Sequence, residues 1–146
     1  MVPDMSIEVR ILCADEAGVL TNVADDVFDH DVRPELAAEY LADPRFHLAV
    51  ALDGEQVVGM ASAIDYVHPD KPSQWFINEV GVAPSHQRRG LGRRLLAALL
   101  AHARARGGVE AWVATEVDNS AARALYADSG GIEDPQRAVV YTFRLE

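Results

Sequence analysis

The turn Gln87-Arg88-Arg89-Gly90-Leu91-Gly92 carries the clearest chemical signal, because it stands between an expected strand and an expected helix. Gly90 and Gly92 remove side chains where the helix begins, so an anion can approach several unpaired backbone N–H groups at the positive end of the helix dipole. Four arginines crowd the same place: Arg88, Arg89, Arg93 and Arg94. Cations oppose the dipole there, and a bound polyphosphate would reconcile them with it. The turn therefore predicts a pyrophosphate-binding site.

Two other nucleotide-binding motifs do not fit this turn. In a dinucleotide-binding G-x-G-x-x-G pattern the third glycine would fall at Leu95, and no Gly-Lys-Ser/Thr follows as a Walker loop requires. The structural alternative is a helix start softened by glycine and surrounded by solvated arginines. The flanking strand and helix make that the weaker interpretation.

The elements that must position this turn follow from the apolar periodicity of the chain. Strands are expected over residues 7–12, 46–52, 57–67, 75–82, 109–115 and 139–145. Helices are expected over residues 15–28, 35–41, 91–106 and 119–128. Three central strands without an intervening helix predict an α/β fold with a mixed, mostly antiparallel sheet, flanked by helices and followed by a β-α-β unit. The length predicts one domain over residues 1–146.

Charge is divided unevenly along the chain, whose formal net charge is −10. Nine acids lie between residues 15 and 43, a stretch with one base, Arg33, and we call them the acidic lobe. The acidic lobe comprises Asp15, Glu16, Asp25, Asp26, Asp29, Asp31, Glu35, Glu39 and Asp43. Residues 80–109 hold six arginines and no acid. This division predicts two ligands of opposite charge, and the overall acidity argues against a nucleic-acid partner.

Other kinds of site and location are not favoured. The five histidines lack metal-binding spacing, so no metal site is predicted. The longest apolar stretch, residues 95–103, is too short to span a bilayer. Residues 1–5 lack the basic start of a secretory signal, and a lone cysteine fits a reducing compartment. We therefore expect a cytoplasmic protein with no membrane partner.

Two segments together resemble the signatures of the GNAT N-acetyltransferase superfamily. The first is Gln87-x-x-Gly90-x-Gly92 after a strand, which is similar to the acetyl-CoA motif. The second is Asp118-Asn119-Ser120-Ala121-Ala122-Arg123-Ala124-Leu125-Tyr126, which precedes Gly130-Gly131. The resemblance covers nearly the whole chain in element order. It implies a GNAT-like fold and acetyl-CoA as co-substrate.

The resemblance also implies a role for each matching position. The backbone of Val80 and Val82 would pair with the pantetheine arm, and Asn119 would contact its thiol end. The pyrophosphate would be held at the turn by Gln87, Arg88, Arg89, Gly90, Leu91, Gly92 and Arg93. Tyr126 would protonate the departing thiolate as general acid. The structural alternative for Tyr126 is an aromatic side chain packed on a helix.

Glu79 is the candidate general base. An amine must lose its charge before it attacks a thioester, and a carboxylate near the acceptor, directly or through a water, can take that proton. Glu79 lies just before the Val80-Gly81-Val82 stretch, so we expect it to face the place where the acetyl group lands. The alternative is an ordinary polar residue on the wet face of a strand.

Within the superfamily the chain most resembles the aminoglycoside 3-N-acetyltransferases, over about residues 28–92. The matching segments are Tyr40-Leu41, Tyr66-Val67-His68-Pro69, Glu79-Val80-Gly81-Val82 and His86-Gln87-Arg88-Arg89-Gly90. This resemblance implies a cationic amine acceptor of the kind met in antibiotic resistance. From their charge, Glu116, Asp118 and the acidic lobe are candidates to bind such an acceptor, and Asp65 and Tyr66, on a strand expected near the same cleft, are candidates to join them. Solvated surface acids are the alternative for these carboxylates.

The chain differs from the aminoglycoside 3-N-acetyltransferases in one segment, and two other functions stay open. Where those enzymes often carry a more acidic segment, this chain has Glu116-Val117-Asp118-Asn119-Ser120. The first alternative is a housekeeping acetyltransferase for another primary amine, such as a polyamine, an amino acid or a peptide N-terminus. A non-catalytic acetyl-CoA-binding module is a further alternative, which the presence of both Glu79 and Tyr126 disfavours. A homodimer is also open as the assembly state.

Overall fold

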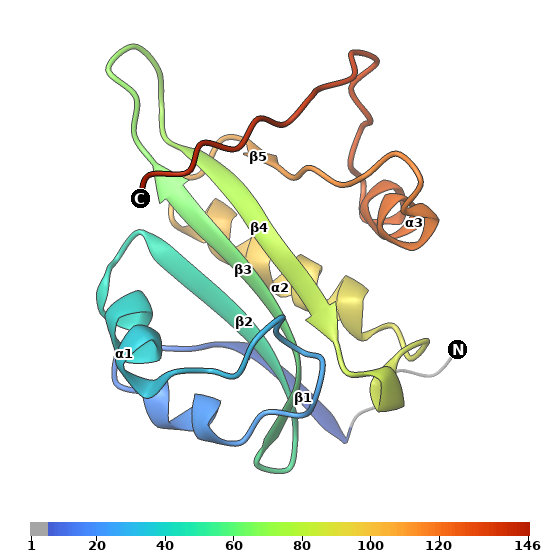
Figure 1. Cartoon of the computed structure of the whole chain (residues 1–146). Coiled ribbons are helices and arrows are strands. Elements are labelled where there is room, and N and C mark those ends of the chain that lie inside the picture. Colours follow the sequence, from blue (N-terminus) through green and yellow to red (C-terminus); the bar gives the residue numbers. More distant parts are fainter. Residues whose placement is uncertain (1–5) are drawn as a thin grey trace.

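A five-stranded sheet runs through the computed structural model, which describes residues 6–146 (Figure 1). The strands lie side by side in chain order: β1 (Ile7–Ile11), β2 (Phe46–Asp53), β3 (Gln56–Tyr66), β4 (Gln74–Val82) and β5 (Ala111–Trp112). The first four strands pair antiparallel, whereas β5 pairs parallel to β4. The predicted α/β architecture with a mixed, mostly antiparallel sheet is therefore confirmed.

The helices of the described residues are the α-helices α1 (Pro34–Ala42), α2 (Leu91–Ala105) and α3 (Ser120–Asp128), and the short 3₁₀ helices η1 (Ala17–Thr21) and η2 (Pro84–His86). Figure 1 shows α2 behind the sheet, and α1 with η1 on its opposite side near β2. The expected central strands and the helices over residues 35–41, 91–106 and 119–128 all form, with ends shifted by one or two residues.

The core lies between α2 and the sheet. Leu91, Leu95, Leu99 and Ala103 form one buried stripe along α2, as their spacing of four residues predicts. Leu95 lies against Gly59 of β3 on this face, whereas Met60, the next residue, faces the opposite way beside Gly81 and is buried under the loop at Val27. Burial of each such side chain contributes about 1.5–3 kcal/mol, so this layer fixes where α2 begins.

The helix predicted over residues 15–28 is wrong beyond its first part, because only Ala17–Thr21 forms, as a 3₁₀ helix. The chain then turns to pair with β3: Ala24 N–H donates to Val57 O, and Val57 N–H donates to Asn22 O. Asp26 follows with a φ of 64°, a conformation that no helix contains. Hydrogen bonding to the sheet has overridden the helical spacing of the valines.

The last two predicted strands also differ from the structure. The strand expected over residues 109–115 is reduced to Ala111–Trp112, and residues 139–145 form no strand. Both segments have the expected composition, so what they lack is a partner: β5 leaves β4 after two residues, and residues 139–145 pair with nothing among the described residues.

Among residues 6–146 no helix has both the length and the hydropathy needed to cross a membrane. The expectation about a secretory signal concerns residues 1–5, which lie outside the described residues.

Candidate active site

A β-bulge on β4 sets the geometry of the site. Glu79 pairs with Ser62 and Ile77 pairs with Ala63, so Asn78 is an extra residue between them. Before the bulge, Trp75 N–H donates to Glu110 O on the β5 side. After it, Ala83 N–H donates to Val58 O on the β3 side. In a regular strand, N–H groups an even number of residues apart point to the same neighbouring strand. Trp75 and Ala83 are an even number of residues apart, so without the extra residue both N–H groups would point to the same side.

The inserted residue therefore turns the backbone groups of Val80 and Val82 away from β3. Gln87 Nε2 donates to Val82 O at 3.0 Å, which agrees with that orientation. β5 pairs with β4 only through Trp75 with Ala111 and Phe76 with Trp112, so it does not cover this edge. An extended ligand can hydrogen bond to Val80 and Val82 here as an added strand would.

The turn after β4 opens the N-terminus of α2. Arg88 has a φ of 64° and Gly90 a φ of 76°, so the chain folds back sharply before Leu91 begins the helix. A Cβ on Gly90 would find nothing within 4 Å, and Gly90 has no side chain with which to cap the first-turn N–H groups. This is the open, positively polarised helix start that an anion needs.

The arginines around that turn divide into two groups. Arg88, Arg89 and Arg93 are exposed, and Arg93 donates to Asp128 of α3 at 2.6 Å. Arg94 instead donates to Ile7 O at 2.7 Å, so its guanidinium ties α2 to β1. The structure thus gives Arg94 a role in packing that the sequence did not indicate.

Glu79 is exposed on the other side of β4, where a pocket of about 310 Å³ opens between the strand and α1. Its walls combine apolar side chains such as Leu20, Phe28 and Leu36 with the polar residues Asn78 and Glu79. A wider pocket of about 550 Å³ adjoins it and shares part of its wall. Four carboxylates of the acidic lobe line the wider pocket: Asp25, Asp26, Asp29 and Asp31. The acidic lobe therefore reaches the neighbourhood of Glu79.

Tyr40 is a residue of this pocket that the sequence did not single out as functional. Its hydroxyl donates to His47 O at 2.7 Å, and lies 3.3 Å from Ala63 O. Burial, with a further contribution from the charge of Glu79, raises its pKa to about 12. Tyr40 stays a neutral donor at physiological pH, so it closes the floor of the pocket without adding charge. Its place beside other helical apolar residues gave no signal of this.

Tyr126 and Asn119 both belong to α3. Burial raises the pKa of Tyr126, which keeps its phenol protonated, the state that a general acid requires. Asn119 is the N-cap of the helix, and its Oδ1 accepts a hydrogen bond from Ala122 N–H at 3.0 Å. Gly92 brings α3 against the turn, because a Cβ there would lie 3.4 Å from Leu125 Cδ2.

The predicted substrate-binding residues do not gather in these pockets. Asp65 accepts a hydrogen bond from His47 at 2.8 Å, and Tyr66 accepts one from Trp112 Nε1 at 2.9 Å. Glu116 and Asp118 are exposed on the segment before α3. None of these four residues lines either pocket. Of the predicted site, the structure brings Glu79 together with the acidic lobe.

Comparison with known proteins gives the family. The acetyltransferase (GNAT) family matches residues 17–130, which include the turn, α2 and α3. The chain belongs to this family. The GNAT part of the predicted resemblance is confirmed, and family membership supports acetyl-CoA as co-substrate.

Two curated relatives of the GNAT chain are acetyltransferases. It is 41% identical over 90 residues to N-alpha-acetyltransferase RimI of Mycobacterium tuberculosis, covering 62% of this chain and 54% of that protein. It is 47% identical over 87 residues to the mycothiol acetyltransferase of Thermobifida fusca, covering 59% of this chain and 25% of that protein. The alignments thus span about half, or less, of the length of these relatives.

Solved structures share the GNAT fold over almost the whole chain. An aminoglycoside acetyltransferase from an uncultured soil metagenomic sample, in complex with trehalose, superposes with a TM-score of 0.80 at 18% identity, covering 97% of this chain and 99% of that chain. An aminoglycoside N-acetyltransferase in complex with CoA superposes with a TM-score of 0.71 at 19% identity, covering 94% and 95%. At these identities the likeness establishes the fold.

The residues of this GNAT chain fit CoA. Its pantetheine arm can use the outward backbone of Val80 and Val82, and its pyrophosphate can use the open start of α2 at Gly90. Exposed Arg88 and Arg89 lie beside that start. The assignments of individual residues stay predictions.

Replacing Gly81 by alanine in the GNAT chain is expected to displace the loop of residues 22–33. A Cβ on Gly81 would lie 2.4 Å from Val27 O, so the loop backbone must shift. That loop lines both pockets, and we expect KM for an amine acceptor to rise about 10–100-fold. The acetyl-CoA Kd should stay unchanged. Steady-state kinetics and calorimetric titration would measure the two constants.

Gly18→Ala in η1 is the matched control, because a Cβ there would meet nothing within 4 Å. Equal effects of the two substitutions on acceptor KM would contradict a role for the loop.

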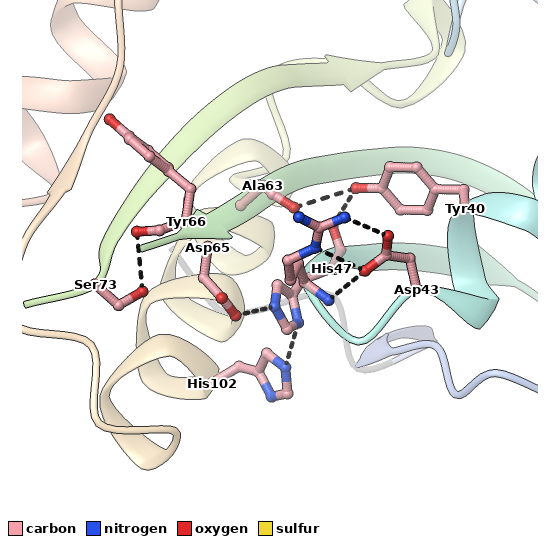
Figure 2. A network of polar contacts seen from close by, with 9 residues as sticks. Tyr40, Asp43, His47, Ala63, Asp65, Tyr66, Ser73 and His102 are labelled. Carbon is pink, nitrogen blue, oxygen red and sulfur yellow. Dashed lines mark hydrogen bonds and ion pairs between the residues drawn. The ribbon is translucent and has the colours of Figure 1, made fainter. Parts of the chain in front are cut away.

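Buried His47 and half-buried His102 lie side by side at the C-terminal end of α2 (Figure 2). His47 is only 6% exposed, stacks on Trp75, and lies between Asp65 at 2.8 Å and His102 at 3.1 Å. Burial lowers the pKa of both histidines from 6.5, and for His47 the carboxylate of Asp65 offsets this in part. Both imidazoles therefore accept a proton less readily in the folded protein than in the unfolded chain.

We expect the free energy of unfolding to fall as the pH drops below about 6.5, by up to about 1.4 kcal/mol per pH unit for each proton that only the unfolded chain takes up. The sign follows because the folded pKa lies below the unfolded one, so acid favours the unfolded state. Urea titrations from neutral to acid pH would show the slope. His102→Gln should flatten it, whereas His30→Gln, at an exposed position, should not. Identical slopes in both variants would contradict this origin.

Proposed function

We propose that this chain is an acetyl-CoA-dependent N-acetyltransferase whose acceptor is a primary amine of a cationic small molecule, and that residues 1–146 act as one N-acetyltransferase domain. One observation carries the proposal: Glu79 opens onto a pocket that adjoins four carboxylates, while the same strand offers outward backbone groups at Val80 and Val82. The base, the acceptor site and the arm-binding edge thus meet on β4.

The proposed chemistry divides between two side chains. Bound acetyl-CoA supplies the acetyl group as a thioester. Glu79 accepts a proton from the acceptor ammonium, directly or through a water, which frees the nitrogen lone pair to form the N–C bond. The C–S bond breaks, and Tyr126 donates its phenolic proton to the departing sulfur. The new amide nitrogen then releases its second proton, which returns to the Tyr126 phenolate, and the proton on Glu79 passes to solvent. The carboxylates in the wider pocket hold the remaining ammonium groups of the acceptor.

The specific acceptor that we propose is an aminoglycoside, acetylated on its 3-amino group. Several ammonium groups on one molecule match four carboxylates around one pocket, and a cleft of one charge raises the local concentration of such a substrate. The fold shared with aminoglycoside acetyltransferases is compatible with this acceptor. Glu116 and Asp118 would add charge at the rim from the segment before α3.

A peptide N-terminal amine is the second candidate acceptor. The 41% identity with N-alpha-acetyltransferase RimI favours it, and so does the apolar wall of the pocket beside Glu79, where Leu20 and Phe28 could contact a side chain. The two candidates differ in how many charges the acceptor carries, so ionic strength distinguishes them.

A thiol-release assay with acetyl-CoA and an amine panel tests the proposal. We expect gentamicin to give the highest kcat/KM, ahead of spermidine, glycine and a peptide that begins with alanine. Its kcat/KM should fall steeply, mainly through KM, between about 0.01 M and 1 M salt, as the Debye length shrinks from roughly 30 to 3 Å. NMR of the product would identify the acetylated amine.

Two other outcomes of the thiol-release assay would each favour an alternative function. A salt-insensitive preference for the peptide would refute the polycationic acceptor and leave the acetyltransferase activity standing. Acetyl-CoA binding without transfer to any amine would leave the non-catalytic module.

A further inference from the structure

The chain that connects β4 to α2 is exposed at every residue but one. Ala83 and Leu91, at the two ends of this connection, are each 1% exposed and belong to the core. Of the seven residues between them, 84–90, only His86 is partly buried, and its side chain is 13% exposed. Residues 84–90, here called the β4–α2 connection, include most of the turn at which we place the pyrophosphate. One side chain therefore packs the middle of a connection whose ends alone reach the core.

His86 contacts two protein groups through its two ring nitrogens. Its Nε2 lies 2.8 Å from Asp53 Oδ2, and its Nδ1 lies 2.7 Å from Ser85 Oγ. An ionised carboxylate only accepts hydrogen bonds, so Nε2 carries a proton and donates it to Asp53. When the ring is neutral, Nδ1 accepts from the Ser85 hydroxyl, and when the ring is charged, Nδ1 donates to it. The contact with Asp53 is therefore compatible with both protonation states of the ring.

Asp53 is held by the sheet at the point where β2 turns into β3. It pairs with Ile7 of β1 on one side and with Gln56 of β3 on the other. β3 separates β2 from β4 in the sheet, so the contact joins the β4–α2 connection to a strand that β4 does not pair with. The connection is thus fixed at a third point besides Ala83 and Leu91.

The backbone that follows His86 has a conformation that an unrestrained loop would seldom keep. Arg88 has a φ of 64°, and Gly90 has a φ of 76°. Glycine adopts such angles readily, but for arginine the Cβ makes them costly. A loop without an anchor would therefore spend much of its time in other conformations. A ligand that needs this one would have to order the loop as it binds, which lowers affinity.

We propose that His86 is a positioning residue for acetyl-CoA, which holds the β4–α2 connection through Asp53 in the conformation that presents the start of α2 to the pyrophosphate. His86 acts through the backbone, because protein groups already occupy both of its ring nitrogens. Since the turn is ordered in advance, binding of acetyl-CoA does not have to supply that order. The inference rests on the proposed placement of the pyrophosphate at this turn.

Charge and position have opposite consequences at Asp53. The pyrophosphate is an anion, so removing a nearby carboxylate would by itself strengthen acetyl-CoA binding. Removing the anchor would weaken it. We expect Asp53→Ala to raise the acetyl-CoA Kd about tenfold, the scale of one lost hydrogen bond to a charged group. Asp53→Asn should not raise the Kd, because its amide oxygen can still accept from Nε2 of His86.

Glu55→Ala is the matched control, because it removes the same charge from the same exposed turn and leaves the contact between His86 and Asp53 in place. It should not raise the Kd. His86→Ala should have the effect of Asp53→Ala, and the double variant should bind no more weakly than either single variant. Calorimetric titration of each variant with acetyl-CoA would measure these constants, after a thermal melt has shown that the variant is folded.

An unchanged or lower Kd in Asp53→Ala would overturn the proposal, and so would effects of the two single substitutions that simply add. The Asp53 variants change an exposed side chain, so they keep the test decisive if His86→Ala does not fold.

Trypsin cleavage without any ligand distinguishes the anchor from the placement of the pyrophosphate. Arg88 and Arg89 are exposed cleavage sites within the connection, and cleavage of a loop follows the population of its open form. Mass spectrometry should show faster cleavage there in Asp53→Ala and not in Glu55→Ala. Faster cleavage with an unchanged Kd would mean that the pyrophosphate binds elsewhere. Unchanged cleavage would mean that the contact does not hold the connection, and either result contradicts the proposal.

Discussion

Replacing Glu79 by glutamine is expected to lower kcat by about 10²–10⁴-fold, the usual contribution of a positioned general base. The amide keeps the size of the side chain but cannot accept the ammonium proton. Glu79 is exposed and pairs across the sheet with Ser62, so the fold does not depend on its charge. The acetyl-CoA Kd should therefore remain unchanged. Stopped-flow thiol release on the fastest acceptor, with calorimetry for the Kd, would measure both.

Glu55→Gln is the control for this substitution. Glu55 is also exposed, and it lies in the turn between β2 and β3, so its loss removes the same charge away from the pockets. Raising the pH should partly rescue the Glu79→Gln variant, because more of the acceptor is then already neutral. Normal turnover at neutral pH would show that the proton leaves by another route.

Replacing Gly90 by valine is expected to weaken acetyl-CoA binding by about 1.4 kcal/mol or more, which is at least tenfold in Kd. A branched side chain would stand at the open start of α2, where a Cβ now meets nothing within 4 Å, and would occupy the space of the pyrophosphate. The φ of 76° adds strain that an L residue tolerates poorly. Gly92 is less suitable for this test, because a side chain there would also meet Leu125.

Gly107→Val is the control that distinguishes the loss of space for the pyrophosphate from the strain of a side chain at positive φ. Gly107 has a φ of 83° and equally open surroundings, but it lies just beyond the other end of α2. Both variants should lose similar stability in a thermal melt, and only the Gly90 variant should lose acetyl-CoA affinity in a calorimetric titration. Equal affinities for acetyl-CoA would place the pyrophosphate elsewhere.

The local sequence predicted those strands and helices whose formation depends only on the residues within them. The β-rich runs of residues 46–52 and 57–67 and the leucine stripe of α2 depend only on which side chains become buried in the core. The misassigned helix over residues 15–28 could not be recognised, because Asn22 and Ala24 hydrogen bond to Val57, which lies far along the chain. The strand predicted over residues 139–145 is a similar case, since no periodicity tells whether a strand has a partner.

The candidate site likewise contains features that the sequence predicted and features that it did not. The turn at Gly90 could be predicted, because glycines and arginines at the start of a helix indicate an anion-binding turn from the local sequence alone. The bulge at Asn78 was not, since an extra residue is defined only against the partner strand. Asp65 shows the limit for single carboxylates: the sequence suggested substrate, whereas the structure gives it a hydrogen bond with buried His47.

The bulge on β4 makes this region sensitive to length more than to side-chain identity. Backbone groups of Val80 and Val82 are what face outward, so any residue that suits a strand can replace these valines and preserve the hydrogen-bonding edge. Deleting Asn78 would instead rotate every later peptide group to the opposite side. In an evolving lineage, apolar residues would replace one another at positions 80 and 82, which pack against the core, and Gly81 would stay fixed beneath Val27, while single-residue insertions and deletions would be removed by selection.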